Sequence, residues 1–369
     1  MKNKLLFFLR KVYFRVRVYP RQVKHLKNYT SQYYGKTYFP DSEHKSEREI
    51  FNEQKKYIRK YGRMNEYYYL YGFDVKGLRN QEEYLDYGVY MHRRDYLNNH
   101  PSKDIYSYTG ILRDKFYFAI FMEQLGFPVP GTIGLYDKGD VFVFASKCNV
   151  NIADVLKNGM ELMFKPLDGI GGVGIYAISM IDGKLYYAGN KISMDELMEM
   201  LSSQRFFIQE RINNQHSKVA ELYPNAVNSL RITTVRDLKS GNIELMGCMF
   251  LMGAREAVVS NWHYGGVIIN VNDQGYFDKY GYSLYEGRID KHPDTGVPFD
   301  GFQVPFFDMA MKEAIRCHQL FYGVHSVGWD FAITKDGVLF IEGNDNWGMA
   351  AHQMVSGGLK KKFEKYYFK

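Results

Sequence analysis

The sequence predicts an α+β fold, because a helical first third is followed by short strands, turns and a few further helices. The chain has 369 residues, of which 46% are hydrophobic and 24% charged, as is typical of a folded protein with a sizeable core. Neither an internal repeat nor a low-complexity linker interrupts the sequence. We expect a basic, tyrosine-rich and mainly helical N-terminal region over residues 1–105, followed by an α+β domain over residues 106–369.

Cysteine content and hydropathy exclude several classes of protein. The three cysteines, Cys148, Cys248 and Cys317, form no CxxC pair, so neither a disulfide framework nor a thiolate metal site is predicted. No apolar run approaches the roughly 20 residues of a membrane-spanning helix. The segment LLFFL near the start is too short for a signal peptide and lacks a small-residue cleavage site. We therefore expect a cytoplasmic protein.

The positive charge of the chain is concentrated at its start. The net charge is +7, yet residues 1–40 alone contain ten Lys or Arg and no Asp or Glu, so the rest of the chain is slightly acidic and no nucleic-acid partner is expected. Within residues 1–18 an apolar stripe at helical spacing is flanked by cations; it comprises Leu5, Phe8, Leu9, Val12 and Val16, beside Lys4, Lys11, Arg15 and Arg17. This pattern resembles a helix that lies at the inner membrane surface. The alternatives are a helix that packs on the body and, for FRVRVYP, a short strand.

Three further helices are indicated before the strands begin. The stretches EREIFNEQKKYIRKYGR and QEEYLDYGVYMHRRDYL have helical character. At LRDKFYFAIFMEQLGFPVP a helix should begin at about Asp114 and stop at Gly126, because Pro128 and Pro130 follow. The sequence changes there from helical to strand-like patterns, which places the start of the second domain near residue 105.

Short strands dominate the next segment. DVFVF and ELMFKP are strand-like, and GIYAISMIDGKLYYAG predicts a hairpin that turns at Asp182 and Gly183. Ser193, with Glu196 three residues later, forms a capping box that should open a helix. This alternation agrees with α+β order.

One lysine precedes a glycine-dense loop in LMFKPLDGIGGVGIY, residues 162–176. The glycines are Gly169, Gly171, Gly172 and Gly174. A Walker loop carries its lysine after the glycines, and the dinucleotide fingerprint has no lysine in front of them. A strand that ends near Lys165, a glycine loop and then a hairpin predict a lid that closes over nucleotide phosphates.

A pair of acids lies in the segment VGWDFAITKDGVLFIEGNDNWG. We expect two strands joined by the three-residue turn KDG, with Thr334 paired to Val338. This register puts Asp330 directly opposite Glu342, and Asn344 on the same face. Opposed like charges are unfavourable unless a cation bridges them, and these oxygen ligands suit Mg2+ or Mn2+. The alternative is an exposed hairpin with solvated acids.

Five motifs follow one another in a characteristic order. They are DK at 114–115, FKP with its glycine loop, FFIQERI at 206–212, NSLRITT at 228–234, and the carboxylate hairpin. This order resembles the ATP-grasp superfamily over about residues 106–350. The resemblance implies two α+β lobes with a nucleotide between them: a lid lobe over about residues 149–208 and a metal-binding lobe over about residues 209–350.

The resemblance also implies roles for individual residues. The phosphates of ATP would be bound by Lys115, Lys165 and the four glycines of the lid. Adenine would bind the backbone of a hinge comprising Gln209, Glu210, Arg211 and Ile212, and ribose would contact Glu210 or His216. Two Mg2+ ions, with Mn2+ as the alternative, would be held by Asp330, Glu342 and Asn344.

The chain departs from the family pattern at one position. Many ATP-grasp ligases have an arginine just before the first metal-binding acid, but here Gly328 and Trp329 precede Asp330. Arg231 in NSLRI is therefore the candidate for contact with the γ-phosphate or an acyl-phosphate. A buried structural arginine is the alternative.

Three segments resemble a narrower branch of the superfamily. NSLRITTV, NWHYGG at 261–266 and FIEGNDNWG look like the ATP-grasp branch associated with sugar transfer and surface polysaccharide biosynthesis. On this resemblance, the acceptor would contact Asn228, Ser229, Asn261, His263, Gly265 and Gly266. The alternative for the NWHYGG loop is a tight turn at its two glycines.

The chemistry that the resemblance implies is carboxylate-amine ligation driven by ATP through an acyl-phosphate. The enzyme would amidate a sugar acid or attach an amino acid in the biosynthesis of capsule, exopolysaccharide or another cell-surface polysaccharide. A kinase acting on a sugar or hydroxyl acceptor and a non-catalytic ATP-binding glycan assembly factor are the alternatives. The expected partners are ATP, a carboxylate, an amine and, through residues 1–18, the inner membrane face.

Overall fold

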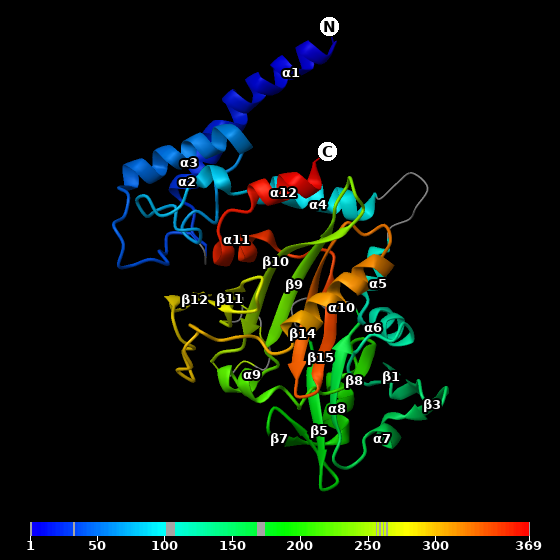
Figure 1. Cartoon of the computed structure of the whole chain (residues 1–369). Helices are drawn as coiled ribbons and strands as arrows, with labels where there is room; N and C mark the ends of the chain where they lie inside the picture. Colours follow the sequence, from blue (N-terminus) through cyan, green and yellow to red (C-terminus); the bar gives the residue numbers. More distant parts are fainter. Residues whose placement is uncertain are drawn as a thin grey trace.

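The computed structural model describes residues 2–31, 34–100, 108–167, 174–255, 257, 260, 262 and 265–368. Helices pack against two antiparallel β-sheets, one of eight strands and one of seven (Figure 1). The predicted α+β fold is confirmed. The domain boundary expected near residue 105 falls among residues 101–107, outside the described residues, and it stays a prediction.

The N-terminal region is helical, as predicted. Helix α1 (Lys2–Tyr13), a π-helical segment (Phe14–Val18) and α2 (Tyr19–Lys27) follow one another without a break. The strand alternative for FRVRVYP is therefore wrong. Helix α3 (Glu47–Tyr61) begins at a capping box formed by Ser46 and Glu49 and contacts α2. A short 3-10 helix (Gln81–Glu83) leads to α4 (Tyr87–Asn99), for which Asp86 is the N-cap.

The eight-stranded sheet has the strand order β3-β2-β1-β8-β4-β5-β6-β7. Its strands are β1 (Thr132–Asp137), β2 (Asp140–Val143), β3 (Cys148–Asn151), β4 (Glu161–Pro166), β5 (Tyr176–Ile181), β6 (Lys184–Tyr187), β7 (Asn190–Ile192) and β8 (Phe206–Glu210). Helices α7 (Ile152–Val155) and α8 (Met194–Met200) pack on it around a core of their own. The hairpin at Asp182 and Gly183 and the capping box of Ser193 and Glu196 are both confirmed.

The seven-stranded sheet has the order β13-β12-β11-β10-β9-β14-β15. Its strands are β9 (Ser229–Arg236), β10 (Ile243–Met252), β11 (Val267–Val271), β12 (Phe277–Ser283), β13 (Gly287–Ile289), β14 (Ser326–Thr334) and β15 (Gly337–Asn344). The associated helices are α5 (Thr109–Arg113), α6 (Lys115–Gln124), α9 (Ser217–Leu222), α10 (Phe307–Leu320), α11 (Met349–Ser356) and α12 (Lys360–Tyr367). Helix α6 starts after Asp114 and the chain turns at Gly126, as predicted.

Different parts of the chain cover the two faces of the seven-stranded sheet. Side chains alternate between the faces along a strand, so Ile232 lies on one face and Arg231 on the other. The face of Ile232 packs against α6, α9 and α10. The opposite face, which includes Met249, is covered by residues 38–84 of the N-terminal region and by α4, α11 and α12. The N-terminal region is thus packed directly on the sheet that carries the predicted metal ligands.

The register of the β14–β15 hairpin corrects one detail of the prediction and confirms another. Thr334 pairs with Gly337 rather than Val338, so the turn has two residues instead of three. A register shift between Asp330 and Phe331 then adds one residue on β15, which is a β-bulge. Because of this bulge, Asp330 still pairs with Glu342, as predicted.

Helix α4 is fixed to the ends of strands β14 and β15 by one buried amide. Asn98 Nδ2 donates hydrogen bonds to the carbonyl oxygens of Ser326 and Asp345, at 3.0 and 2.8 Å. Asn98 Oδ1 accepts from the backbone N–H groups of His325 and Ser326, at 3.0 and 2.9 Å. These four bonds pair peptide groups that would otherwise be buried without partners.

We expect the change Asn98→Ala to lower the free energy of unfolding by about 3 kcal/mol, because it leaves buried peptide groups unpaired. Urea denaturation of the full chain measures this. His92→Ala, on the exposed side of the same helix, serves as the control and should change stability by no more than about 0.5 kcal/mol. Equal stability of Asn98→Ala and the wild type would contradict the anchoring role.

Candidate functional site

The centre of the site is a group of polar side chains on three neighbouring strands. Arg231 lies on β9, Asp330 on β14 and Glu342 on β15, and Asp330 is paired in register with both of the others. Arg231 Nε donates to Asp330 Oδ1 at 2.6 Å, and Arg231 Nη2 donates to Oδ2. Asn344 Nδ2 donates to Asp330 Oδ2 at 3.3 Å and to Glu342 Oε1 at 3.1 Å. Arg231 and all three predicted metal ligands therefore come together.

Burial and neighbouring charges give the carboxylates of Asp330 and Glu342 different pKa values. Burial raises the pKa of Asp330 to about 6, against the opposing effect of Arg231. Burial also acts to raise the pKa of Glu342, but Arg231 and the hydrogen bond from Asn344 hold that pKa below its ordinary value. As the pH falls, the first proton to bind this pair is therefore held by Asp330.

The lid lysine is held by a side chain of the neighbouring strand. Lys165 lies near the end of β4, and its Nζ donates to Gln209 Oε1 on β8 at 2.8 Å. Gln209 is 3% exposed, and its Nε2 donates in turn to the carbonyl oxygen of Pro130 at 3.2 Å. Burial lowers the pKa of Lys165 to about 8. The ammonium of the half-buried Lys165 is thus held in place by Gln209.

The second predicted lysine begins a helix that contacts strands of both sheets. Lys115 is the first residue of α6, and its backbone N–H donates to the carbonyl oxygen of Leu167, just beyond β4, at 3.2 Å. Its charge acts on Lys165, whose pKa it lowers, and on Glu342, whose pKa it also lowers. Glu342 in turn acts to raise the pKa of Lys165. The two lysines therefore lie within electrostatic range of the carboxylate pair.

The predicted adenine hinge follows directly after β8. The backbone N–H groups of Glu210 and Arg211 donate to the carbonyl oxygens of Gly131 and Glu161, both at 2.9 Å. Among the described residues, no hydrogen bond of the Ile212 N–H is found. A backbone donor in this position could bind an adenine ring nitrogen, and the hinge role stays a prediction.

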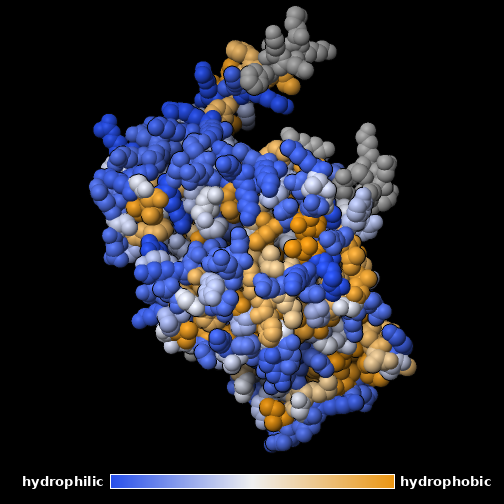
Figure 2. Space-filling view, in the orientation of Figure 1, coloured by the Kyte–Doolittle hydropathy of each residue, from blue (hydrophilic) through white to orange (hydrophobic). Residues whose placement is uncertain are grey.

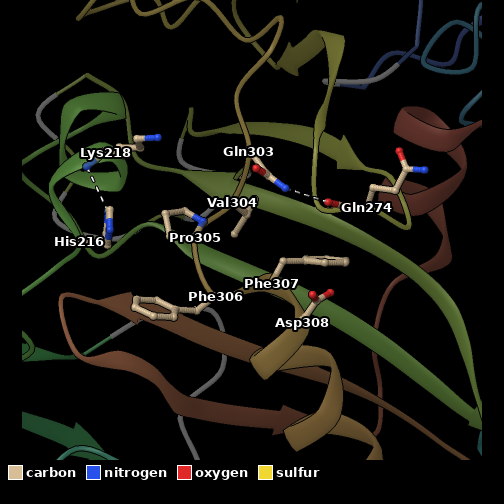
Figure 3. A pocket seen from close by; sticks show the side chains of 9 residues that line it. All are labelled: His216, Lys218, Gln274, Gln303, Val304, Pro305, Phe306, Phe307 and Asp308. Atoms are coloured by element: carbon tan, nitrogen blue, oxygen red, sulfur yellow. Dashed lines mark hydrogen bonds between the residues drawn. The ribbon is translucent and has the colours of Figure 1, made fainter.

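His216 lies beside β14, where its backbone N–H donates to the carbonyl oxygen of Ile333 at 2.9 Å. It is the N-cap of α9, where its Nδ1 accepts from Lys218 N at 3.3 Å. It lines a cavity of about 360 Å3 at the start of α10, shown in Figure 3. The lining residues are His216, Lys218, Gln274, Gln303, Val304, Pro305, Phe306, Phe307 and Asp308. No predicted phosphate or metal residue lines this cavity, and the ribose role of His216 stays a prediction.

Of the predicted acceptor residues, Asn228 is hydrogen-bonded inside the fold, and its acceptor role stays a prediction. It is fully buried, and its Nδ2 donates to the carbonyl oxygens of Val219 and Tyr223 at 2.9 and 2.8 Å. Its Oδ1 accepts from Gly253 N at 3.3 Å, so the amide is already satisfied inside the fold. Ser229 is 5% exposed, and its Oγ lies 3.3 Å from that of Ser260.

The glycine-rich loops are described only in part. Gly169, Gly171, Gly172, Asn261 and His263 lie outside the described residues. Gly174 has a φ of +72° and Gly265 a φ of +92°, conformations that favour glycine. Gly265 N donates to the carbonyl oxygen of Trp262 at 3.0 Å, and Gly266 follows in a buried position. The chain therefore turns tightly at Gly265, which is the alternative for this loop.

The carboxylate pair has the chemistry of a magnesium site. Within the described part of the chain no cluster of three or more His, Cys, Asp or Glu could hold a metal ion, and the predicted set contains only two acids beside an amide. Two facing carboxylates are nevertheless only partly neutralised by Arg231, and their oxygens are the ligands that Mg2+ prefers. Rotation of the Asn344 amide would present its Oδ1 as a third oxygen. Asp330, Glu342 and Asn344 therefore fit Mg2+.

Comparison with protein families decides the assignment. The family model described as "Sugar-transfer associated ATP-grasp" matches residues 95–366, almost three quarters of the chain. The chain belongs to the sugar-transfer associated ATP-grasp family. No curated protein shows significant sequence similarity to it. The predicted superfamily and its narrower branch are thus both confirmed.

Several solved structures resemble this ATP-grasp chain at low sequence identity. D-alanine–D-alanine ligase from Bacillus anthracis is 14% identical, with 70% of this chain and 68% of that chain covered and a TM-score of 0.39. N5-carboxyaminoimidazole ribonucleotide synthetase from Thermotoga maritima is 15% identical, with coverage of 68% and 48% and a TM-score of 0.38. Biotin carboxylase from Campylobacter jejuni is 13% identical, with coverage of 70% and 47% and a TM-score of 0.41.

These structural likenesses carry no part of the family assignment, which rests on the family match. This chain spans about half the length of the synthetase and of the carboxylase.

Two contacts of the ATP-grasp site could not be read from the sequence. One is the side-chain bond from Gln209 to Lys165. The other is an ion pair in which Arg113 Nη2 lies 2.6 Å from Oδ2 of Asp345, the residue after Asn344. Asp345 is 2% exposed, so this pair fixes the end of β15 against α5. The only sign of this pair in the sequence was that Arg113 directly precedes the DK motif and Asp345 directly follows Asn344.

We expect Lys165 to lose its proton near pH 8 in the nucleotide-free protein, because burial lowers its pKa to about 8. Phosphates placed beside the ammonium should raise that midpoint by about one pH unit or more. NMR of 13C-methylated lysines can follow the titration with and without MgATP, and Lys165→Arg identifies the signal. A midpoint near the ordinary value of 10.5 in the free protein would show that the ammonium is solvated.

Proposed function

We propose that this ATP-grasp protein is an ATP-dependent carboxylate-amine ligase that works through an acyl-phosphate. The observation that carries the proposal is the grouping of Lys115, Lys165 and Arg231 around the facing carboxylates Asp330 and Glu342. Such a combination of fixed cations and metal-binding acids suits the transfer of a phosphoryl group. The family match supports the proposal but does not choose the acceptor.

ATP would bind between the two sheets. Its phosphates would contact Lys115 and Lys165, and its adenine would contact the hinge that ends at Ile212. The structures of D-alanine–D-alanine ligase from Bacillus anthracis with ATP and of a biotin carboxylase domain with MgADP have this kind of ligand, each in its own protein. Asp330, Glu342 and Asn344 would hold Mg2+, which when bound neutralises phosphate charge.

In the first step an oxygen of the substrate carboxylate attacks the γ-phosphorus, and the bond from that phosphorus to the bridging oxygen of ADP breaks. The products are an acyl-phosphate and ADP. Lys165 and Lys115 stabilise the charge that spreads over the transferred group and the leaving ADP. Arg231, held by Asp330, is placed to act on the γ-phosphate or the acyl-phosphate.

In the second step the amine nitrogen attacks the carbonyl carbon. A carbon–nitrogen bond forms, the bond from that carbon to the phosphate oxygen breaks, and the nitrogen loses a proton. Phosphate is then released. A lid that closes over the site would exclude the water that otherwise hydrolyses the intermediate.

For the substrate we propose a sugar acid, or an amino acid to be attached to a polysaccharide precursor, in the cytoplasmic synthesis of capsule, exopolysaccharide or another cell-surface polysaccharide. The support is the family description, which associates these ATP-grasp domains with sugar transfer. Ser229, beside Arg231 on the same strand face, is the described residue best placed to contact such an acceptor.

The test is a screen of ADP release with uronic acids paired with amino acids, and mass spectrometry of the products. Ligation predicts that ADP and phosphate appear together with a product joined by a carbon–nitrogen bond. A phosphorylated sugar without any need for an amine would identify a kinase instead. Binding of ATP without turnover on any pair would favour the non-catalytic assembly factor.

We expect Lys165→Met and Lys115→Met each to reduce turnover about 100-fold or more, which is the scale for loss of one fixed charge stabiliser. Steady-state ADP release measures this on folded protein. Lys184→Met, an exposed lysine at the start of β6, is the matched control and should turn over like the wild type. Wild-type turnover in either of the first two variants would remove that lysine from the site.

We expect Glu342→Gln to weaken Mg2+-dependent nucleotide binding at least about 10-fold, because one carboxylate ligand is lost while the pair of Arg231 and Asp330 stays intact. In the wild type, Mg2+ affinity should fall as the pH drops through about 6, since Asp330 then takes up a proton. Isothermal titration calorimetry from pH 5 to pH 8 measures both effects. Unchanged Mg2+ dependence in Glu342→Gln would exclude this carboxylate as a ligand.

A further inference from the structure

The first helix of the chain extends away from the body of the protein. In Figure 1 α1 projects beyond α3, and in Figure 2 apolar and hydrophilic surface lie side by side on this projection. None of the described side chains of α1 belongs to a hydrophobic core cluster. The helix therefore leaves large apolar side chains in contact with water.

The continuous helix over residues 2–27 has one side that packs and one that does not. Phe14, Tyr19 and Val23 pack against a cluster of Leu26, Ile58 and Met64 on α2, α3 and the turn after α3. In contrast, a separate set of apolar residues is 41–65% exposed; it comprises Leu6, Phe8, Leu9, Val12, Tyr13 and Val16.

The exposed apolar residues form a stripe on the side opposite to the body. At 100° per residue in α1, Leu9 and Val12 lie about 60° apart around the helix axis. Phe14 packs against the body, whereas Leu9, Val12 and Val16 are 53%, 41% and 65% exposed. Because Phe14 faces the body, the stripe faces away from it. The packed residues thus leave the stripe free for a second surface.

The flanks of this stripe are basic. Arg10, Arg15 and Arg17 alternate along the chain with the residues of the stripe, and all three are exposed. Residues 1–40 contain no acidic residue that could neutralise them within the segment. Two copies of such a helix would bring like charges together, which disfavours self-association as the way to cover the stripe.

We propose that residues 6–18 form an interfacial anchor that lies in the surface of an anionic lipid bilayer, with the apolar stripe among the acyl chains and the flanking arginines at the headgroups. This inference is independent of the proposed ligase activity. The combination of an apolar face and flanking cations has the chemistry of helices that lie in the plane of a membrane surface. None of the described helices is long and apolar enough to cross a bilayer, and an anchor of this kind does not need to.

The anchor also orients the body. Phe14 and α2 hold the helix against α3, and α3 belongs to the N-terminal region that packs on the seven-stranded sheet. When the stripe is in the membrane, the body must therefore lie on the opposite side of the helix, in the aqueous phase. An acceptor carried on a lipid would then meet the enzyme at the membrane surface.

The experiment is cosedimentation of the full chain with vesicles of phosphatidylglycerol and phosphatidylcholine, compared with vesicles of phosphatidylcholine alone. We expect binding to the anionic vesicles that weakens in high salt. A triple change, Leu9→Ser, Val12→Ser and Val16→Ser, should weaken it about 100-fold, and so should Arg10→Gln, Arg15→Gln and Arg17→Gln.

A matched control removes exposed apolar residues elsewhere. Leu125, Ile181 and Leu320 are 40%, 50% and 49% exposed on the body, and changing all three to Ser should leave vesicle binding unchanged. Thermal unfolding of every variant shows that the fold is retained. Loss of binding in the control, or no binding of the wild type at low salt, would overturn the proposal.

Two further outcomes separate lipid from other occupants. Phe8→Trp should show a blue-shifted emission, quenched by brominated lipid, in the presence of anionic vesicles, whereas Phe14→Trp on the packed side should not change. Equal binding to both kinds of vesicle would overturn the anionic surface as the partner. A dimer in sedimentation velocity that the Ser triple variant abolishes would identify a second copy of the chain instead.

Discussion

Two carboxylates that face each other across a pair of strands repel each other. The cations around them in this site offset that repulsion. Arg231 compensates it in part through its two bonds to Asp330, while Lys115 on α6 and Lys165 on β4 contribute further positive charge. The raised pKa of Asp330 reflects the remaining cost of burying the charge. A divalent cation would offset the negative charge of the two carboxylates. The phosphates of ATP would offset the positive charge of the two lysines.

The strand registers position these groups with little freedom. Asp330 is paired on one side with Arg231 and on the other with Glu342, so the three backbones are joined by ladders of hydrogen bonds. The β-bulge in β15 is necessary for this arrangement, because the two-residue turn alone would place Glu342 out of register with Asp330. A bulge that re-aims a side chain beside a functional site is a known use of this irregularity.

The N-terminal region contributes directly to the face of the sheet that carries Arg231. Asn98 holds the start of β14 and the residue that follows β15, and the Trp347 carbonyl oxygen accepts bonds from the hydroxyl of Tyr90 and from Arg94. Arg113 fixes Asp345, next to Asn344. The helices before and after the sheet therefore keep the strands that carry Asp330 and Glu342 in place, and α2 and α3 connect the same body to the projecting α1.

The sequence by itself determined the local features of this protein: the helix that begins after Asp114, the hairpin at Asp182 and Gly183, the capping box of Ser193 and the pairing of Asp330 with Glu342. The first three depend on residues close together in the chain, where turn and capping chemistry act directly. The pairing of Asp330 with Glu342 also depends on the bulge in β15, which the sequence did not reveal. The order of short motifs was also sufficient to indicate the family.

Only the tertiary structure decided which distant side chains meet. Gln209 on β8 binds Lys165 on the neighbouring strand β4, and the side chain of Asn228 forms buried hydrogen bonds. Arg113 pairs with Asp345, which lies 232 positions further along the chain. Whether the first helix packs or projects depends likewise on which of its sides meets α3. Such contacts depend on strand order and on how separate elements pack, and no spacing within one segment of the sequence specifies them.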